Sequence, residues 1–563
     1  MNRQAAIHFP ARGVKPDGPT KHTTITFAAL HADTDAIAHG LVAAGITRGT
    51  RTALMVPPSP DFFALTFALF KVAAVPVLID PGMGVKNLGT CLAEAAPEAF
   101  VGILKAHLAR RILGWGRKTT RTTVNAGRWR FFCDTSLSQL RAVGATRGPF
   151  SIPDVATDET AAVLFTSGST GIAKGAVYTH GIFAAQVEAL KATYGIEPGE
   201  IDLCTFPLFA LFGPALGMTC VIPDMDPTRP ARIDPRKAVA QIRQFGATNM
   251  FGSPAVIRRL GEWGDSAKSP PLATLRRAIS AGAPASAVAL ERFSRLLPES
   301  AQVFTPYGAT EALPVANIGS HEILSETRHQ TDQGKGVCVG RPIAGITVYV
   351  IPISDEPIPE WDDVKCLPPG EIGEFVVRGP VVTREYFHRT EATRLAKIHD
   401  PKTGDILHRM GDVGYLDEQG RMWFCGRKSH RVVTPWGTLF TDQVEPVFNT
   451  IPGVSRSALV GVSRGGVTYP VICWEEWGRA WRGAETMSRH RVAARLKEQA
   501  QGFEHTRPIG TFLLHPGFPV DIRHNSKIFR EKLAVWADKT LGKSWLPGDN
   551  TSVQAPTDSG GPI

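Results

Sequence analysis

Short apolar runs alternate with stretches of helical periodicity from about residue 24 to residue 350. In one example, RTALMVPPS at residues 51–59 precedes DFFALTFALFKVAA at 61–74, and VPVLID follows at 75–80. The first and third segments have the length and apolar content of buried strands, and the middle one has the length of a helix. Repeated strand–helix–strand units predict an α/β fold on a mainly parallel sheet.

The pattern changes near residue 370, where short strands are separated by turns, as in GEIGEFVVRGP and YLDEQGRMWFCGR. These segments predict an antiparallel β element. After residue 427 a smaller α/β part follows, with strands expected in SALVGVS and TYPVICW and helices in HRVAARLKEQA and KIFREKLAVWA. We therefore expect a domain boundary at residues 426–429. The tail 546–563 is rich in Ser, Thr, Gly and Pro and is expected to be disordered.

The composition narrows the class of protein. With 563 residues, 43% hydrophobic and 20% charged, the chain can bury large cores, which excludes disordered, collagen-like and coiled-coil proteins. Its eight cysteines include no CxxC pair, so we expect buried thiols in a reducing compartment rather than disulfides or a zinc site. The N-terminal segment MNRQAAIHFPARG lacks the apolar core of a signal peptide, and we expect a cytoplasmic protein.

One uncharged stretch, FPLFALFGPALGMTCVIP at residues 206–223, approaches the length of a membrane span. Its prolines and glycines would interrupt a helix exposed to lipid. We expect a buried apolar wall here and no integral membrane segment. Such a wall would suit alkyl chains, and an ordinary core element would have the same sequence.

A loop rich in hydroxyl groups and glycine follows the apolar run at residues 162–165. Its members are Thr166, Ser167, Gly168, Ser169, Thr170, Gly171 and Lys174. Closely spaced N–H and O–H groups can approach phosphate oxygens, and the lysine adds positive charge. The spacing matches neither a Walker A loop nor GxGxxG. A simple surface turn is the alternative, and the preceding strand together with the lysine favours a phosphate loop.

This loop resembles the phosphate loop of the adenylate-forming superfamily, which includes acyl-CoA synthetases, peptide-synthetase adenylation domains and luciferases. Five further segments follow in that family's order: SAGAP at 280–284, YGATE at 307–311, HRMGD at 408–412, GR at 426–427 and HNSKI at 524–528. The resemblance spans roughly residues 20–545. It implies an N-terminal adenylation domain at 1–425, a hinge at 426–429 and a small mobile α/β domain at 430–545 that carries the catalytic lysine.

The resemblance also implies roles for these segments, with ATP and Mg²⁺ as cofactors. Tyr307 would pack on adenine, Glu311 would bind Mg²⁺, and Asp412 and Arg427 would bind the ribose hydroxyls. The catalytic residues would be Lys527, Glu311 and Thr166. The other nucleotide contacts would come from the phosphate loop and from Gly282, Ala283, Pro284, Gly308, Ala309 and Thr310.

The chemistry of the residues agrees with these roles. Joining a carboxylate to AMP gives it a good leaving group, but attack on the α-phosphate brings two anions together. A metal held by a carboxylate such as Glu311, and a cation such as Lys527 that bridges both partners, would offset this repulsion. Asp412 can accept hydrogen bonds from both ribose hydroxyls; a turn residue within GDVGYLDEQG is the less favoured alternative.

Five positions depart from the family pattern. Ala173 replaces the usual proline of the phosphate loop, and Ser526 replaces the glycine before Lys527. Ala210 stands where many acyl-CoA synthetases have a histidine, Ser429 replaces the hinge Asp or Lys, and Val433 replaces a lysine that serves the second half-reaction. These changes weaken the features linked to an external thiol acceptor.

Among the branches of the superfamily, FPLFALFGPALG and the GDVGYLDEQG–FCGRKSHRVVT stretch most resemble the β-lactone synthetases of bacterial long-chain olefin biosynthesis. This resemblance implies adenylation of a long-chain 2-alkyl-3-hydroxyalkanoic acid, followed by attack of its own hydroxyl and release of a β-lactone. It also implies assembly with other enzymes of that pathway. The alternatives are a long-chain acyl-CoA synthetase, a fatty acyl-AMP ligase, or a nucleotide-binding scaffold without activity.

Two other sequence features lie outside these motifs. GVSRG at residues 461–465 fits the GxSxG pattern of a hydrolase elbow, but the following glycines predict a turn rather than a helix. Between Lys105 and Arg130 lie eight basic residues and no acidic one, interleaved with Trp115 and Trp129. We call this segment the basic cluster. A solvated face is its simplest interpretation, because no nucleic-acid-binding motif accompanies it; the alternative is a surface for nucleic acid, an anionic membrane or a partner protein.

The net charge of +10 suits capture of the anions ATP, pyrophosphate, AMP and a fatty carboxylate. These ligands do not account for the basic cluster, which lies outside every motif.

Overall fold

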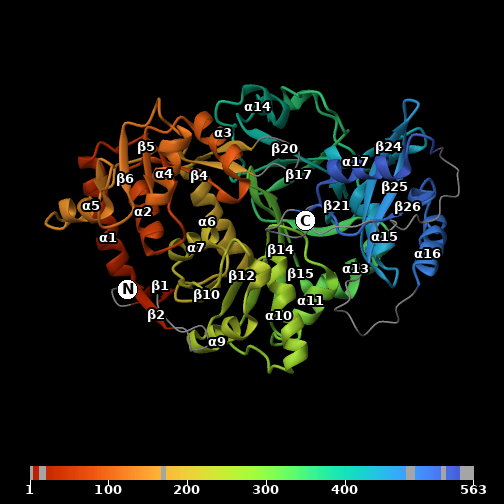
Figure 1. Ribbon diagram of the computed structural model, residues 1–563, viewed down its shortest axis with the longest axis horizontal. Coiled ribbons are helices and arrows are strands. Elements are labelled where there is room, and N and C mark those ends of the chain that lie inside the picture. The colour runs from red at the N-terminus through yellow and green to blue at the C-terminus, as the bar shows by residue number, and fades with distance from the viewer. Residues whose placement is uncertain (1–3, 12–20, 167–172, 477–487, 521–527, 546–563) are drawn as a thin grey trace.

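The computed structural model describes residues 4–11, 21–166, 173–476, 488–520 and 528–545. Two large sheets and a small one organise this part of the chain, with one further short hairpin. Figure 1 shows the first sheet and its helices on the left, the C-terminal elements on the right, and the largest sheet between them.

The first sheet has seven strands in the order β7-β6-β5-β3-β4-β8-β9. All neighbours are parallel except β8 and β9, which form an antiparallel hairpin. The strands are β3 (Arg51–Met55), β4 (Val75–Ile79), β5 (Ala99–Gly102), β6 (Thr122–Asn125), β7 (Thr135–Ser136), β8 (Thr160–Thr166) and β9 (Lys174–Thr179). The helices are α1 (Phe27–Ala43), α2 (Pro60–Lys71), α3 (Val85–Ala95), α4 (Leu104–Leu113) and α5 (Leu137–Gly144).

Helix α2 illustrates how the local sequence builds this layer. Ser59 caps its first turn by accepting a hydrogen bond from the Phe62 N–H, and Pro60 supplies the preferred first helical residue. Its Phe63 and Leu65 side chains are fully buried, and each stabilises the fold by roughly 1.5–3 kcal/mol. The predicted strand–helix–strand unit at residues 51–80 is therefore confirmed as β3–α2–β4.

The largest sheet has fourteen strands, parallel over β1-β11-β10-β12-β13-β14 and antiparallel from β14 onward. Its strands are β1 (Ala5–Pro10), β2 (His22–Thr26), β10 (Ile201–Cys204), β11 (Thr219–Val221), β12 (Asn249–Gly252), β13 (Arg277–Ser280), β14 (Gln302–Ala309), β15 (Ala312–Gly319), β16 (Val337–Pro342), β17 (Thr347–Ile351), β18 (Gly373–Arg378), β19 (Lys397–His399), β20 (Ile406–Leu416) and β21 (Met422–Arg427). Its helices are α6 (His180–Tyr194), α7 (Pro207–Ala210), α8 (Phe212–Ala215), α9 (Pro235–Phe245), α10 (Pro254–Ala267), α11 (Ala287–Ser294), α12 (Ser320–Glu322), α13 (Arg328–Asp332) and α14 (Thr390–Ala396).

The antiparallel element is confirmed, but it begins earlier than predicted. The expectation of a mainly parallel sheet up to residue 350 is wrong for β14, β15 and β16, which pair antiparallel. The apolar content of these strands did not distinguish the two pairings, because the connection between β14 and β15 is a tight turn rather than a helix.

The C-terminal elements form a three-stranded sheet, β24-β25-β26, with three helices and the β22–β23 hairpin. They are β22 (Val432–Thr434), β23 (Gly437–Leu439), α15 (Thr441–Asn449), β24 (Val454–Arg464), β25 (Val467–Glu476), α16 (Arg489–Gln501), β26 (Thr511–Leu514) and α17 (Arg530–Leu541). Two apolar clusters belong to these elements alone, one around Phe448 and Trp474 and one around Leu533. The boundary at 426–429 and the mobility of this part stay predictions, and the tail 546–563 lies outside the described residues.

Three smaller expectations have clear outcomes. Residues 206–223 divide into α7, α8 and β11, and no helix among the described residues is long and apolar enough to cross a membrane. Ser463 of GVSRG lies inside β24 and faces Thr468 across the hairpin to β25, so the motif is the end of a strand followed by a hairpin turn, not the strand-to-helix elbow of a hydrolase. All eight cysteines are free thiols, and seven of them are buried.

Candidate nucleotide-binding site

The ends of the predicted phosphate loop are held together by strand pairing. Thr166 at the end of β8 pairs with Lys174 at the start of β9, so the loop is the connection of a hairpin. Ala173 is buried in the apolar cluster beneath the first sheet. The Thr166 side chain lies outside the described part of the structure, as do the loop residues Ser167, Gly168, Ser169, Thr170 and Gly171.

Lys174 is the loop residue whose surroundings are described. Its side chain is half-buried, and its Nζ lies 5.0 Å from the centre of the Tyr386 ring. A cation at this distance from an aromatic face is attracted to the ring. Lys174 therefore lies close to Tyr386, which in turn contacts Glu311.

Glu311 is the first of those residues, and it sits in the turn between β14 and β15. The Tyr386 hydroxyl donates a hydrogen bond of 2.7 Å to Glu311 Oε1. The backbone of the turn is held too, because the Thr383 N–H and hydroxyl both donate to the Glu311 carbonyl and the Tyr178 hydroxyl donates to the Thr310 carbonyl. In the described residues no basic side chain forms an ion pair with the Glu311 carboxylate within 4.0 Å, and Lys397 and Arg427 interact with it only at longer range.

The turn also needs a residue without a side chain. A Cβ added at Gly308 would lie 2.8 Å from the Ala312 carbonyl oxygen, which is too close for any other residue. Ala309 pairs with Ala312 across this hairpin, after a bulge next to Tyr307. The YGATE segment is therefore a tight hairpin that presents Glu311 at its tip.

Asp412 is a second buried carboxylate, on β20. Arg427 faces it on β21, with Nη1 2.9 Å from Asp412 Oδ1, and the Tyr307 hydroxyl donates a 2.6 Å hydrogen bond to Oδ2. Burial raises the pKa of Asp412, while Arg427 and the Tyr307 hydroxyl act in the opposite direction. The sequence motifs HRMGD, GR and YGATE are thus brought together around one carboxylate.

The SAGAP segment follows β13, which pairs in parallel with β14. Gly282 has a φ of +95°, a conformation that favours glycine, while Gly282 and Pro284 are exposed and Ala283 is half-buried. Because parallel neighbours end at the same sheet edge, this segment and Tyr307 lie on one side of the site.

The structure adds three residues that sequence reasoning missed: Thr383, Tyr386 and Lys397. The Lys397 side chain is buried and donates to the Thr383 carbonyl and, at 3.0 Å, to its hydroxyl. Burial lowers the pKa of Lys397 to about 7. The neutral form of this amine is therefore populated near neutral pH, unlike that of an ordinary lysine. No motif marks these residues, because the contacts of Thr383 and Tyr386 with Glu311 span about 70 residues of sequence and form only in the folded chain.

The hinge departures lie on the surface of the described structure. Ser429 is exposed, and Val433 is exposed on the β22–β23 hairpin. Lys428 is held instead, with Nζ 2.7 Å from the Ser354 carbonyl and 3.3 Å from Glu374. Lys527 and Ser526 lie outside the described residues, and helix α17 begins at Arg530, which forms an ion pair of 2.6 Å with Glu445.

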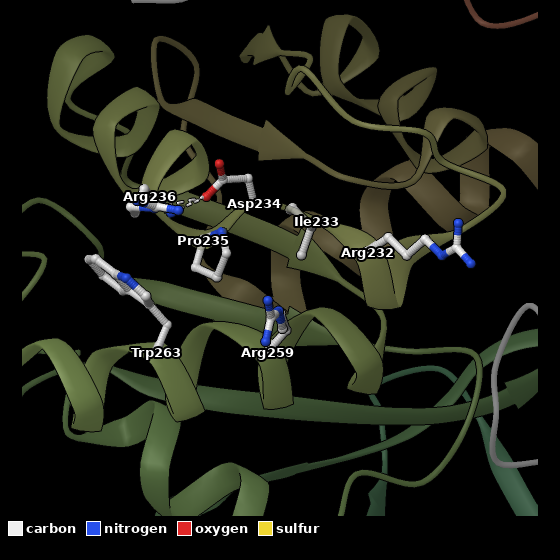
Figure 2. Close-up of a pocket in the computed structure, with 7 residues that line it drawn as sticks. All are labelled: Arg232, Ile233, Asp234, Pro235, Arg236, Arg259 and Trp263. Carbon is white, nitrogen blue, oxygen red and sulfur yellow. Dashed lines mark hydrogen bonds and ion pairs between the residues drawn. The ribbon is translucent and has the colours of Figure 1, made fainter. Parts of the chain in front are cut away.

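A surface cavity of about 370 Å³ lies elsewhere, near the start of α9. Figure 2 shows that three arginines and Trp263 surround it, and that Asp234 lies beside Arg236. None of the predicted site residues lines this cavity. It is therefore separate from the candidate nucleotide site.

Known proteins of similar sequence and fold point to the same class of enzyme as the motifs. The family model described as AMP-binding enzyme matches residues 3–387. An olefin beta-lactone synthetase of Xanthomonas campestris pv. campestris is 50% identical over 95% of this chain and 94% of its own, and one of Stenotrophomonas maltophilia is 48% identical over 96% of each. An amide bond synthetase of Marinactinospora thermotolerans has the same fold, with a TM-score of 0.73 at 22% identity over 91% of this chain and 95% of that one.

Proposed function

Because the chain belongs to the AMP-binding enzyme family, we propose that it is an ATP-dependent ligase that converts a long-chain 2-alkyl-3-hydroxyalkanoic acid to a β-lactone. The near-full-length likeness to two olefin beta-lactone synthetases carries this proposal. The grouping of Lys174, Tyr386 and Glu311, and of Tyr307, Asp412 and Arg427, supports the adenylating half of it.

In the first step a carboxylate oxygen of the acid attacks the α-phosphorus of ATP, and the bond to pyrophosphate breaks. Lys174 and the hydroxyl groups of residues 166–170 hold the phosphates, and Lys527 bridges the two anionic reactants. Asp412 and Arg427 bind the ribose, while Tyr307 and the segment Gly282–Pro284 border the adenine. These assignments are part of the proposal.

The residues fit Mg²⁺ as a companion of ATP. Mg²⁺ is usually held by one or two carboxylates together with substrate phosphates, not by a cage of protein ligands. Glu311 offers such a carboxylate. Among the described residues it forms no ion pair with a basic side chain and belongs to no group of three acidic, His or Cys side chains. When bound, the metal would neutralise phosphate charge.

In the second step the 3-hydroxyl oxygen of the bound acyl adenylate attacks the carbonyl carbon. The bond between that carbon and the AMP oxygen breaks, AMP leaves with one oxygen of the original carboxylate, and the hydroxyl proton is released. The nucleophile is held beside the carbonyl by the substrate itself, which replaces an external acceptor by proximity. The exposed Val433 at the position of a second-step lysine agrees with this route.

The experiment is incubation of the pure protein with ATP, Mg²⁺ and a 2-alkyl-3-hydroxy acid in the absence of CoA, with products analysed by mass spectrometry. We expect a β-lactone, AMP and pyrophosphate in equal amounts. Product that forms only with CoA would identify an acyl-CoA synthetase. An acyl adenylate without lactone would identify an acyl-AMP ligase, and no acid-dependent pyrophosphate would identify a scaffold.

We also propose that the enzyme acts in the cytoplasm and in an assembly with the other enzymes that make and consume these long-chain intermediates. The hydrophobic acid and lactone favour direct transfer between enzymes, because long alkyl chains are poorly soluble in water. Sedimentation of the enzyme mixed with its pathway partners would test this assembly.

A further inference from the structure

The basic cluster and the loop after it form one continuous surface at the end of the molecule opposite the C-terminal elements. Helix α4, strand β6 and helix α5 lie at the left of Figure 1, and α16 lies at the right. Arg111 of α4 stacks over Phe132 of the loop, with 4.9 Å between the guanidinium carbon and the ring centre. We call α4 together with residues 114–132 the basic apolar face.

The inward side of α4 is anchored to the first sheet. His107 is buried and its Nε2 donates a hydrogen bond of 2.9 Å to the Val124 carbonyl, and Arg110 lies over the Phe100 ring. Trp115 is half-buried against α3, where a Cβ added at Gly89 would lie 2.8 Å from its Nε1. The rest of the helix is therefore free to face outward in a fixed orientation.

Six large apolar side chains project into solvent from this anchored frame: Leu108, Ile112, Leu113, Trp129, Phe131 and Phe132. Ile112 is 80% exposed, Trp129 is 62% exposed and Phe131 is 55% exposed. Six exposed large apolar side chains within 25 residues, on two segments joined by the Arg111–Phe132 contact, are typical of an interaction surface.

The aromatic loop is held in place rather than loose. The Asn125 side chain donates to the Trp129 carbonyl at 2.6 Å, and the Ser136 hydroxyl donates to the Arg128 carbonyl at 3.1 Å. Phe131 has a φ of +49°, which is rare for a bulky residue. The fold thus accepts an unfavourable backbone conformation while leaving an aromatic ring in water.

The charges of this face are all of one sign. Seven of the eight basic side chains between residues 105 and 130 are exposed, and none forms an ion pair with a carboxylate in the described part of the chain. The neighbouring Asp134 accepts two 2.8 Å hydrogen bonds, from the N–H and the hydroxyl of Thr123. A partner for this face must therefore bring negative charge and also accept apolar side chains.

We propose that the basic apolar face docks the enzyme on the surface of an anionic lipid bilayer. The exposed Ile, Leu, Trp and Phe side chains enter the boundary between headgroups and acyl chains, and the Lys and Arg side chains contact lipid phosphates. Nucleic acid satisfies the charges and can stack on aromatic rings, but it offers no apolar environment for Leu108, Ile112 and Leu113. The basic cluster contains no acidic residue. This favours a uniformly anionic surface as the partner over a protein, whose surface carries both positive and negative charges.

Vesicle co-sedimentation of the full-length protein tests this docking without using its activity. We expect binding to phosphatidylcholine vesicles that contain about one-third phosphatidylglycerol, and loss of binding on pure phosphatidylcholine or at about 0.5 M salt. Equal binding to both kinds of vesicle, or no binding to the anionic one, would overturn the proposal. Because the wild-type protein gives this result, it does not depend on any variant folding.

Charge reversal then locates the surface. Each basic side chain near an anionic bilayer contributes roughly a fivefold change in partitioning, so the triple variant Lys118→Glu, Arg121→Glu and Arg128→Glu is expected to bind about a hundredfold more weakly. The matched control reverses the charge of three exposed arginines around the cavity of Figure 2, by Arg232→Glu, Arg236→Glu and Arg259→Glu. A loss of the same size in the control would show that only net charge matters and would overturn the assignment.

The apolar half needs its own pair of variants. Ile112→Ser with Trp129→Ser is expected to weaken vesicle binding at least tenfold. The control, Val288→Ser with Val535→Ser, removes two apolar side chains elsewhere that are each more than half exposed, and leaves vesicle binding unchanged. Circular dichroism confirms that each variant is folded. If the first pair instead changes the mass of an enzyme assembly in light scattering and leaves vesicle binding intact, the face is a protein interface and the proposal is wrong.

Discussion

Two carboxylates of the candidate site share one feature and differ in another. Asp412 and Glu311 each accept a hydrogen bond from a tyrosine hydroxyl, at 2.6 Å from Tyr307 and 2.7 Å from Tyr386. Asp412 also has a resident cation, Arg427, at 2.9 Å. Among the described residues Glu311 has no cation in ion-pair contact, and Lys397, a buried amine that interacts with it at longer range, has its pKa lowered to about 7.

This difference separates two kinds of binding. A carboxylate whose charge is already balanced can accept hydrogen bonds from neutral hydroxyl groups without attracting a metal. A carboxylate without a cationic partner, in a partly buried setting, attracts a divalent cation. Asp412 is thus suited to ribose and Glu311 to Mg²⁺, and this division follows from the contacts of the two side chains.

The largest effect is expected from removing the unbalanced charge. Glu311→Gln keeps the hydrogen bond from Tyr386 but loses the negative charge, so acid-dependent pyrophosphate release should fall about 10²–10³-fold in kcat. The measurement is a pyrophosphate-coupled assay over a range of Mg²⁺ concentrations. If Gln at this position retained full activity and Mg²⁺ dependence, Glu311 would not be the metal ligand.

A smaller effect is expected at the balanced carboxylate. Asp412→Asn weakens a charge-assisted contact to the ribose worth about 1.5–3 kcal/mol, so the KM for ATP should rise roughly 10–100-fold with a smaller change in kcat. Comparing KM for ATP with that for 2′-deoxy-ATP shows whether the hydroxyl contact is lost. An unchanged KM in the Asn variant would show that Asp412 does not bind the ribose.

The two tyrosines provide a matched pair of conservative changes. Tyr386→Phe and Tyr307→Phe each remove one hydroxyl that donates to a carboxylate, a contact that contributes about 0.5–1.5 kcal/mol. We expect Tyr386→Phe to lower kcat and raise the Mg²⁺ requirement several-fold, and Tyr307→Phe to act mainly on the KM for ATP. The same kinetic signature in both variants would show that the two carboxylates do not have separate roles.

The smallest effect on activity is expected from a change behind Glu311, and stability reports it best. The folded-state pKa of Lys397, about 7, lies below its unfolded value, so the unfolded chain binds more protons between about pH 7 and pH 10.5. The free energy of unfolding should therefore rise with pH across this window by up to about 1.4 kcal/mol per pH unit. Below pH 7 Lys397 is protonated in both states, so its destabilising contribution no longer changes with pH.

The control for this slope is Lys397→Met, which keeps the volume of the side chain but cannot titrate. Denaturant unfolding at pH 7, 8 and 9 should show that the slope of the variant is smaller than that of the wild type. Equal slopes would mean that Lys397 stays charged in the folded protein, and Glu311 would then have a nearby cation after all.

The sequence predicted the framework of this site better than its interior. Strand–helix alternation identified β3–α2–β4, and the motif spacing identified the segments that carry Glu311, Asp412 and Arg427. Secondary-structure propensities and motifs describe residues that are close in the sequence. They therefore did not predict the antiparallel turn at β14–β15 or the contact of Tyr386 with Glu311. The same limit applies to the basic cluster, because its charges were visible in the sequence but its projecting Ile112 and Phe131 were not.

Oxygen labelling tests the adenylate route most directly. A 2-alkyl-3-hydroxy acid carrying ¹⁸O in both carboxylate oxygens is incubated with the enzyme, ATP and Mg²⁺ without CoA, and the products are analysed by mass spectrometry. We expect one labelled oxygen in AMP and one in the carbonyl of the β-lactone, with the unlabelled hydroxyl oxygen in the ring. Unlabelled AMP, with both heavy oxygens elsewhere, would contradict activation of the carboxylate by adenylation.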